Sequence, residues 1–269
     1  MDWKGREQSQ NVEDRRGSSG GGGGRTPGIL GIIVVLIGAY YGVDLSGLVG
    51  TPSMGTGSTQ TSQLKPQEEA ELNELARVVL ADTEKAWGSY FKQIGRTYTP
   101  TTLVLYNGGT STACGMGQSA MGPFYCPGDK KVYLDLDFYR DMQTKLNSAS
   151  DAAFAYVIAH EVGHHVQNLL GILPKVHRMQ QQVDKKEANA LSVKLELQAD
   201  CYAGIWGHYA VNNNIFKAED ITKAMLAAES VGDDRLQKDG QGYVVPDSFT
   251  HGSSEQRMAW LKRCNTFGN

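Results

Sequence analysis

Two pairs of imidazole or carboxylate side chains, each with its members four residues apart, constrain the fold of this chain more than any other feature. His160 and His164 belong to the motif H-E-x-x-H, and Glu196 and Asp200 belong to a second motif, E-x-x-x-D. Side chains four residues apart lie on the same face of an α-helix. The spacing therefore predicts two helices whose ligand-bearing faces share one metal ion.

The chemistry of these side chains favours a hydrolytic zinc site. A catalytic zinc ion takes three protein ligands and keeps one position open, and His160, His164 and Glu196 can supply the three. Glu161 lies roughly 100° further round the first helix, so it can reach a metal-activated water as the general base without ligating the metal. Asp200 is then placed to accept a hydrogen bond from the far ring nitrogen of a ligand histidine.

A less specific interpretation is that the two helices simply carry polar, solvated faces. The surroundings of Glu196 and Asp200 argue against it, because their neighbours in the sequence are apolar. These neighbours include Leu195, Leu197, Ala199, Ala203 and Trp206. Carboxylates in so apolar a stretch need partners, and a zinc ion together with a histidine N–H would satisfy both.

These motifs resemble those of a known group of enzymes. H-E-x-x-H followed by E-x-x-x-D is similar to the gluzincin zinc metallopeptidases, and the whole chain resembles the bacterial neutral zinc metallopeptidase family. The similar segments are NVEDRRG (11–17), GPFYCPGDKKVYLDLDFY (122–139), HEVGHHVQ (160–167), LELQADCYAG (195–204) and FTHGSSEQR (249–257). The resemblance implies a zincin-like domain with Zn²⁺ as cofactor and a peptide or protein substrate. It also implies a short N-terminal tail, a single membrane anchor and an exported domain.

The resemblance further implies roles for two more segments. In gluzincins, a strand ahead of the metal-binding helix forms the edge of the active-site sheet and pairs with an extended substrate; here this would be the strand at 132–138. Related membrane peptidases carry a T-H-P segment, which Thr250-His251-Gly252 resembles with Gly in place of Pro. His251 is therefore expected to be catalytic, as a donor to the developing oxyanion. The alternative is that His251 caps the helix that follows.

Composition divides the chain into four parts. Residues 1–25 are polar and end in a glycine run, which predicts a disordered cytoplasmic tail. Residues 26–50 hold a single charged residue, Asp44, and approach the ~20 apolar residues of a transmembrane helix, so we expect an anchor in the lipid bilayer. A cleaved signal peptide and a buried core helix are the alternatives. A flexible linker rich in Gly, Ser and Thr at 51–66 and a folded metallopeptidase domain at 67–269 complete the chain.

The charges that flank the apolar segment predict its orientation. Arg15, Arg16 and Arg25 precede it, and the first basic residue after it is Lys65. Positively charged flanks stay in the cytoplasm. We therefore expect a single-pass protein of the inner cell membrane, with its catalytic domain on the extracytoplasmic side.

That location would be oxidising, which makes disulfide bonds plausible for the four cysteines. Four cysteines allow three connectivities. The favoured connectivity joins Cys114 to Cys126 and Cys201 to Cys264, and the second of these bonds would fasten the C-terminal helix to the helix that carries Glu196.

Within the domain, the hydrophobic periodicity predicts an α+β fold that is mostly helical with a small sheet, preceded by a single transmembrane helix. The expected helices cover 67–94, 151–170, 187–212, 217–230 and 254–264, and the expected strands lie near 103–105 and 132–137. The formal net charge of −3 at pH 7 excludes a protein that binds nucleic acid through a basic surface.

The function predicted by these features is that of a membrane-anchored zinc endopeptidase. It would hydrolyse peptide bonds through a metal-activated water, with Glu161 as the general base. Two alternatives stay open: a non-catalytic, metal-stabilised binding protein tethered to the membrane, and a zinc amidase that acts on cell-envelope material. A purely structural metal site has no use for Glu161, and a substrate-binding edge strand favours an extended peptide. The substrate's identity and the oligomeric state do not follow from the sequence.

Overall fold

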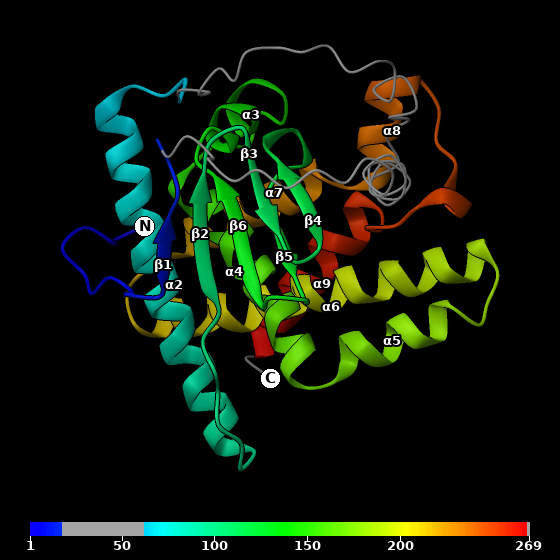
Figure 1. The fold of residues 1–269 in the computed structure, drawn as a ribbon, viewed down its shortest axis with the longest axis horizontal. Helices are drawn as coiled ribbons and strands as arrows, with labels where there is room; N and C mark the ends of the chain where they lie inside the picture. Colours follow the sequence, from blue (N-terminus) through cyan, green and yellow to red (C-terminus); the bar gives the residue numbers. More distant parts are fainter. Residues whose placement is uncertain (18–61, 268–269) are drawn as a thin grey trace.

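The protein combines a four-stranded sheet with a layer of helices, as a computed structural model shows for residues 1–17 and 62–267. The sheet has the order β1-β2-β6-β5, in which β1, β2 and β6 are parallel and β5 is antiparallel to β6, while β3 and β4 form a separate hairpin (Figure 1). The strands are β1 (Val12–Asp14), β2 (Thr102–Tyr106), β3 (Gly109–Thr112), β4 (Gly115–Gln118), β5 (Phe124–Cys126) and β6 (Lys131–Asp135).

The helices account for most of the described residues, and several of them stack behind the sheet in Figure 1. They are α2 (Pro66–Gln93), α3 (Phe138–Thr144), α4 (Asp151–Leu169), α5 (Ile172–Gln180), α6 (Lys185–Asn212), α7 (Ala218–Ser230), α8 (Asp233–Gln241) and α9 (Ser254–Phe267), with short 3-10 turns at η2 (Ser119–Met121) and η3 (Pro246–Ser248). The predicted α+β class with a small sheet is confirmed.

Helix α4 is the central element, and its sequence explains why. The Ser150 hydroxyl accepts a hydrogen bond from the Ala153 N–H at 3.0 Å, which satisfies one of the free donors at the start of the helix. Most of α4 is buried, so the helix packs on several neighbours at once. At Gly163 the backbone of α6 comes so near that a Cβ atom would lie 3.1 Å from the Ala199 carbonyl oxygen. The absence of a side chain at Gly163 therefore sets the spacing between the two helices.

Replacing Gly163 by alanine is expected to destabilise the protein by about 1–3 kcal/mol, because the new methyl group would push against the backbone of α6. The matched control is Gly88→Ala in α2, where a Cβ atom would meet nothing within 4 Å. There the better helix propensity of alanine is expected to add about 0.5–1 kcal/mol. Urea unfolding of both variants measures the difference, and equal stability of the two would contradict the close helix contact.

Residues 1–17 belong to the folded domain, which corrects the prediction of a disordered tail for this part of the chain. Strand β1 pairs in parallel with β2, with Val12 opposite Leu103. Trp3 is 3% exposed, and its indole N–H donates to Asp151 Oδ2 at the start of α4, 2.7 Å away. A polar segment without hydrophobic periodicity is ordered here because its few apolar side chains, Met1, Trp3 and Val12, pack in the main hydrophobic core.

Replacing Trp3 by alanine is expected to cost about 3–5 kcal/mol of unfolding free energy, the usual range for a buried aromatic side chain. The control is Trp260→Ala, because Trp260 is 40% exposed and should contribute less than about 1 kcal/mol. Thermal or urea unfolding of the full chain compares the two. Equal stability of both variants is the result that a disordered N-terminal segment would give.

The position of residues 1–17 also bears on the predicted membrane topology. Arg15 pairs with Glu13 at 2.7 Å, and Arg16 pairs with Glu69 in the first turn of α2 at 2.8 Å. Arg15 also donates from Nη1 to Thr110 Oγ1 at 2.8 Å, so both arginines are part of the domain. The predicted location of the protein stays a prediction.

The predicted anchor at 26–50 lies outside the described residues, as does most of the predicted linker at 51–66. In the part of the chain that the structure describes, none of the helices has the length and apolar character needed to cross a bilayer. Ordered contacts of the domain resume before the predicted boundary at residue 67, because the Ser62 hydroxyl donates to Asp137 Oδ1 at 2.7 Å.

Both predicted disulfide bonds are confirmed. Cys114 and Cys126 join the β3–β4 hairpin to β5, and Cys201 and Cys264 join α6 to α9. The second bond lies where α6 and α9 pack tightly, since a Cβ atom at Gly204 would lie 2.3 Å from the Leu261 carbonyl oxygen. The C-terminal helix is thus fixed against the helix that carries Glu196 and Asp200.

Candidate metal centre

Helices α4 and α6 bring the three predicted metal ligands together. Glu196 Oε2 lies 3.1 Å from His160 Nε2, and Glu196 Oε1 lies 3.3 Å from His164 Nε2. One ligand atom from each of the three residues falls within 4.8 Å of the others. In a tetrahedral zinc site with bonds of about 2.1 Å, neighbouring ligand atoms are about 3.4 Å apart. The three side chains therefore fit around Zn²⁺.

The hydrogen bonds of the two imidazoles also indicate a cation between them. His160 Nδ1 lies 2.8 Å from Asp200 Oδ1, and His164 Nδ1 lies 2.9 Å from Gln167 Oε1. A neutral imidazole has one N–H. If that proton serves the acceptor at Nδ1, the lone pair on each Nε2 faces the Glu196 carboxylate. A cation bound between the Nε2 atoms and Glu196 removes this conflict, and the donor set of two imidazoles and one carboxylate suits zinc.

Asp200 orients the first of these ligands and is itself held by a buried network. Its carboxylate receives two hydrogen bonds from Arg257, from Nε at 2.9 Å and from Nη2 at 3.1 Å, and one from the Tyr156 hydroxyl at 2.6 Å. Asp200 is 0% exposed and Arg257 is 4% exposed. Such two-pronged arginine–carboxylate pairs are among the strongest charge-assisted hydrogen bonds. Asp200 therefore keeps a fixed position from which it accepts a hydrogen bond from the Nδ1–H group of His160.

The charges in this network shift the pKa values of its members. Burial alone would raise the pKa of Asp200, but Arg257 and His160 outweigh it and lower the pKa to about 2. Burial alone would lower the pKa of His160, but the carboxylates of Asp200 and Glu196 raise it to about 10. The carboxylates of Asp200 and Glu196 therefore favour a positive charge beside them, which a proton or a divalent cation can supply.

Glu161 lies beside the ligands without joining them. It follows His160 on α4, is 8% exposed, and lines the same cleft as the three ligand side chains. Burial raises the pKa of its carboxyl group above the usual range. A carboxylate is a more effective general base when its pKa approaches the working pH, so the position and environment of Glu161 suit proton transfer.

His251 lies in the loop between η3 and α9 and lines this cleft as well. Asp233, the first residue of α8, holds the loop: its Oδ2 atom accepts N–H groups from Thr250, His251 and Gly252 at 2.9, 2.7 and 2.9 Å. The imidazole Nδ1 lies 2.9 Å from Thr250 Oγ1 and 3.4 Å from Asp233 Oδ1. The loop and the ring are therefore held at one place on the cleft wall.

The capping role that His251 could have had belongs to another residue. At the start of α9, the Ser253 hydroxyl accepts from the Gln256 N–H at 3.2 Å, and the Gln256 side-chain oxygen accepts from the Ser253 N–H at 3.0 Å. This reciprocal pair is a capping box. His251 lies outside it.

The cleft around these residues has a volume of about 830 Å³. Beyond the polar residues of the centre, its walls are largely apolar. The apolar lining includes Met116, Met121, Phe124, Phe138, Leu173 and Leu236. The cleft is large enough for several residues of a polypeptide and offers apolar side chains a place to bind.

The strand that borders the cleft is β5, which corrects the prediction that the strand at 132–138 forms the edge. Strand β6 (Lys131–Asp135) lies in the interior of the sheet, between β2 and β5. Among the described residues, β5 has β6 as its one sheet neighbour, so its other edge is available toward the cleft. The outer neighbour of β6 is β5, which has three residues. A strand this short carries no period-2 pattern, so sequence periodicity could not show that β6 lies inside the sheet.

Strand β5 is held against α4 through Tyr125. The Tyr125 oxygen accepts a hydrogen bond from Asn168 Nδ2 at 2.9 Å and lies 2.9 Å from His165 Nδ1. His165 Nε2 lies 2.7 Å from the Thr99 carbonyl oxygen, which can only accept, so Nε2 carries the proton and Nδ1 accepts from Tyr125. His165 therefore connects the sheet to the helix and stays outside the metal centre.

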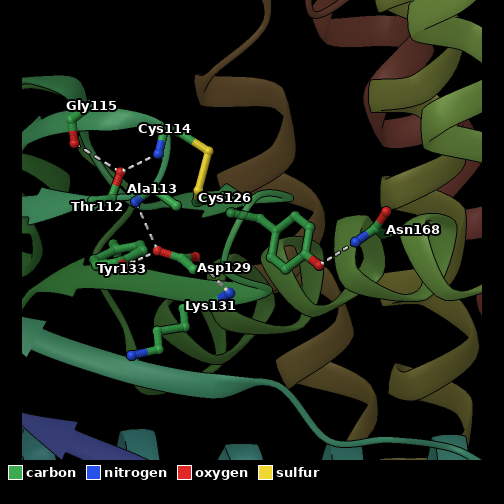
Figure 2. The surroundings of a disulfide bond; sticks show 10 residues. Thr112, Ala113, Cys114, Gly115, Cys126, Asp129, Lys131, Tyr133 and Asn168 are labelled. Carbon is green, nitrogen blue, oxygen red and sulfur yellow. Dashed lines mark hydrogen bonds between the residues drawn. A yellow bond between two sulfur atoms is a disulfide. The ribbon is translucent and has the colours of Figure 1, made fainter.

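The β3–β4 hairpin is joined to β5 by a disulfide bond (Figure 2), and several of its residues line the cleft. Its turn is fixed by the disulfide between Cys114 and Cys126. It is also fixed by a hydrogen bond from the Ala113 N–H to Asp129 Oδ2 at 3.1 Å. The Thr112 hydroxyl accepts from the Cys114 N–H at 2.9 Å and closes the turn. The hairpin is therefore a fixed wall of the cleft.

Several residues of the centre escaped the motif analysis. Tyr156 and Gln167 lie on the same helix as the two histidines, at four residues before His160 and three after His164, so helical spacing could have revealed them. Asp233 carries no such signal, because its partners are 17 to 19 residues away in a loop. The structure brings five of the six predicted site residues to one cleft and places the sixth, Asp200, behind His160. The roles assigned to Glu161 and His251 stay predictions.

Comparison with known proteins agrees with this geometry. The family model described as "Putative neutral zinc metallopeptidase" matches residues 1–269. The chain is 52% identical to the Escherichia coli K12 protein "Uncharacterized protein YpfJ", over 100% of this chain and 99% of that protein. It is 39% identical to "Uncharacterized protein Rv2575" of Mycobacterium tuberculosis, over 71% of this chain and 68% of that protein. No solved structure matches the chain.

Proposed function

Because the chain belongs to the Putative neutral zinc metallopeptidase family, we propose that it is a zinc-dependent endopeptidase that cleaves extended polypeptides in the cleft between β5 and α8. The observation that carries the proposal is the ligand triangle of His160, His164 and Glu196 with the buried carboxylate of Glu161 beside it in a cleft of about 830 Å³. A metal held for structure alone needs neither the extra carboxylate nor the open cleft.

The proposed mechanism assigns one task to each side chain. His160, His164 and Glu196 would hold Zn²⁺, which supplies a Lewis acid for the substrate carbonyl and lowers the pKa of water when bound. Glu161 accepts the proton of the attacking water and returns it to the leaving amine. Asp200 keeps the imidazole of His160 in the tautomer that presents Nε2 to the metal position.

His251 is assigned to the oxyanion that forms during attack. The Thr250 hydroxyl lies 2.9 Å from His251 Nδ1. With this hydroxyl as the donor, the neutral imidazole carries its proton on Nε2. An N–H donor held in place before the reaction stabilises negative charge at little cost of reorganisation. Asp233 supports this role by holding the loop through three backbone N–H groups.

The shape of the cleft supports an extended peptide substrate. The available edge of β5 offers backbone hydrogen-bonding groups to an added strand, a common mode of peptide recognition. The apolar lining favours substrate segments with large apolar side chains on either side of the bond that is cleaved. An unfolded protein presents such segments, whereas a folded one buries them.

The experiment that tests the proposal incubates the full chain with casein. The full chain is needed because β1 belongs to the sheet. Untreated protein, protein treated with a chelator, and treated protein with Zn²⁺ restored are compared, and mass spectrometry identifies the fragments. We expect internal cleavage in the first and third samples and none in the second.

Two other results would favour the alternatives. Release of fragments from peptidoglycan without cleavage of casein indicates the amidase. Zinc bound one to one, with neither substrate cleaved, indicates a metal-stabilised binding protein.

We also propose that residues 26–50 hold the protein at a membrane. The support is their sequence, in which Asp44 is the single charged residue. The two disulfide bonds agree with a location outside the reducing cytoplasm. Fractionation of cells that express the full chain tests this location. We expect the protein with the membranes, and a variant lacking 26–50 in the soluble fraction.

A further inference from the structure

The two chain segments that flank residues 18–61 attach to the domain at the same place. Arg16 donates from Nη1 to Glu69 Oε1 at 2.8 Å, and Glu69 belongs to the first turn of α2. Ser62 lies just before α2 and donates to Asp137 at 2.7 Å. The chain therefore leaves the domain and rejoins it near the N-terminal end of α2, the upper end of that helix in Figure 1.

The attachment of residues 1–17 is extensive. Strand β1 forms a parallel ladder with β2, and Glu13 of β1 pairs with Lys131 of β6 at 2.8 Å across the sheet. Trp3 is buried in the main core against residues of the domain. Detaching this segment from the rest of the domain would expose Trp3 and leave the edge of β2 without its neighbour. Residues 1–17 and 62–267 therefore form one folded unit.

From this packing we propose that residues 1–17 and residues 62–267 lie on the same side of the membrane, with the end of the domain that carries Arg16 and Ser62 facing the lipid. The proposal rests on the membrane location proposed above for 26–50. A single crossing by 26–50 would place β1 and β2 on opposite sides of the bilayer, which their hydrogen-bonded ladder forbids. A return to the same side by two full crossings needs about 40 apolar residues, more than this segment contains.

The proposed partner of the end of the domain that carries Arg16 and Ser62 is thus a lipid bilayer, which this end contacts from one side. This differs from the single-pass arrangement that the flanking charges predict, because Arg15 and Arg16 serve ion pairs of the domain and are not free to act as a topological signal. Residues 18–61 join the domain near Arg16 at one end and Ser62 at the other. Both connections would keep the domain close to the membrane surface.

The test labels introduced cysteines with a maleimide that cannot cross membranes. Lys4→Cys reports on the N-terminal segment and Lys262→Cys on the domain; the Lys4 side chain is 69% exposed, and Lys262 is also exposed. All four native cysteines form disulfides, and the native chain measures any background labelling. Each variant of the full chain is labelled in intact spheroplasts and after lysis, in separate samples.

The proposal predicts that the two variants behave alike: both are labelled in intact spheroplasts, or both only after lysis. Labelling of one in intact spheroplasts and of the other only after lysis would overturn it and establish a single crossing. Recovery of the full chain in the soluble fraction would also overturn it, because the proposal requires residues 26–50 to hold the protein at a membrane. Thermal unfolding equal to that of the native chain shows that both variants are folded. None of these readouts uses catalysis, so a failure of the peptidase assignment is detected separately by the casein experiment.

Discussion

Replacing Glu161 by glutamine is expected to lower kcat/KM for peptide hydrolysis by about 10²–10⁴-fold, the usual contribution of a general base. The glutamine side chain has nearly the same shape but cannot accept a proton. Because Glu161 is 8% exposed and lies beside the ligands without joining them, the zinc content and the melting temperature should stay close to those of the native protein. Cleavage kinetics with a peptide derived from casein and zinc analysis of the same samples measure both effects.

The matched control for this prediction is Glu219→Gln, an exposed carboxylate in the first turn of α7. It should leave kcat/KM unchanged. If Glu161→Gln retains activity within a factor of about three while the zinc ligands remain essential, a different group accepts the proton and the mechanism above is wrong.

Replacing Arg257 by methionine is expected to lower the free energy of unfolding by about 3–5 kcal/mol, because it leaves a buried carboxylate without its partner. Asp200 is 0% exposed and accepts two hydrogen bonds from Arg257. Methionine fills part of the volume of the arginine side chain, so the loss reports on the charge more than on packing. We expect weaker zinc binding as well, by about 10–100-fold, since Asp200 orients His160.

Two further variants make the Arg257 result interpretable. Lys262→Met lies on the same helix at an exposed position and should change the unfolding free energy by less than about 0.5 kcal/mol. Combining Arg257→Met with Asp200→Asn removes both charges and should recover part of the stability, because no buried charge is left unpaired. Urea unfolding of all variants provides the comparison. Equal losses from Arg257→Met and Lys262→Met would show that the pair contributes nothing.

The metal centre could be predicted from the sequence because its geometry depends on local periodicity. His160, Glu161 and His164 lie within one and a half turns of a helix, and Glu196 and Asp200 lie one turn apart on another. A helix converts such spacing into a shared face without help from the rest of the molecule. The apolar neighbours of Glu196 further indicated burial, and its 5% exposure agrees. The two disulfide pairings were also anticipated.

The N-terminal segment could not be predicted in the same way. Val12 to Asp14 form a three-residue strand whose partner lies some 90 residues away in the sequence, too short for a period-2 pattern. Its order depends on β2 offering a free edge and on a gap in the core that Trp3 fills. The same limit applies to the edge of the sheet. Strand β5 has three residues and no periodic signal of its own, so the prediction of the edge at 132–138 depends on the resemblance to gluzincins alone.

What the sequence by itself determined is the chemistry: which side chains can hold zinc, which carboxylate is left to move a proton, and which helical faces must be buried. Those properties follow from residue type and from spacing within single helices. Only the tertiary structure decided which strand borders the cleft, how Asp233 holds the loop of His251, and that residues 1–17 share a sheet with the domain. Each of these depends on contacts between segments far apart in the chain, whose free energy comes from burial and hydrogen bonding that no local pattern records.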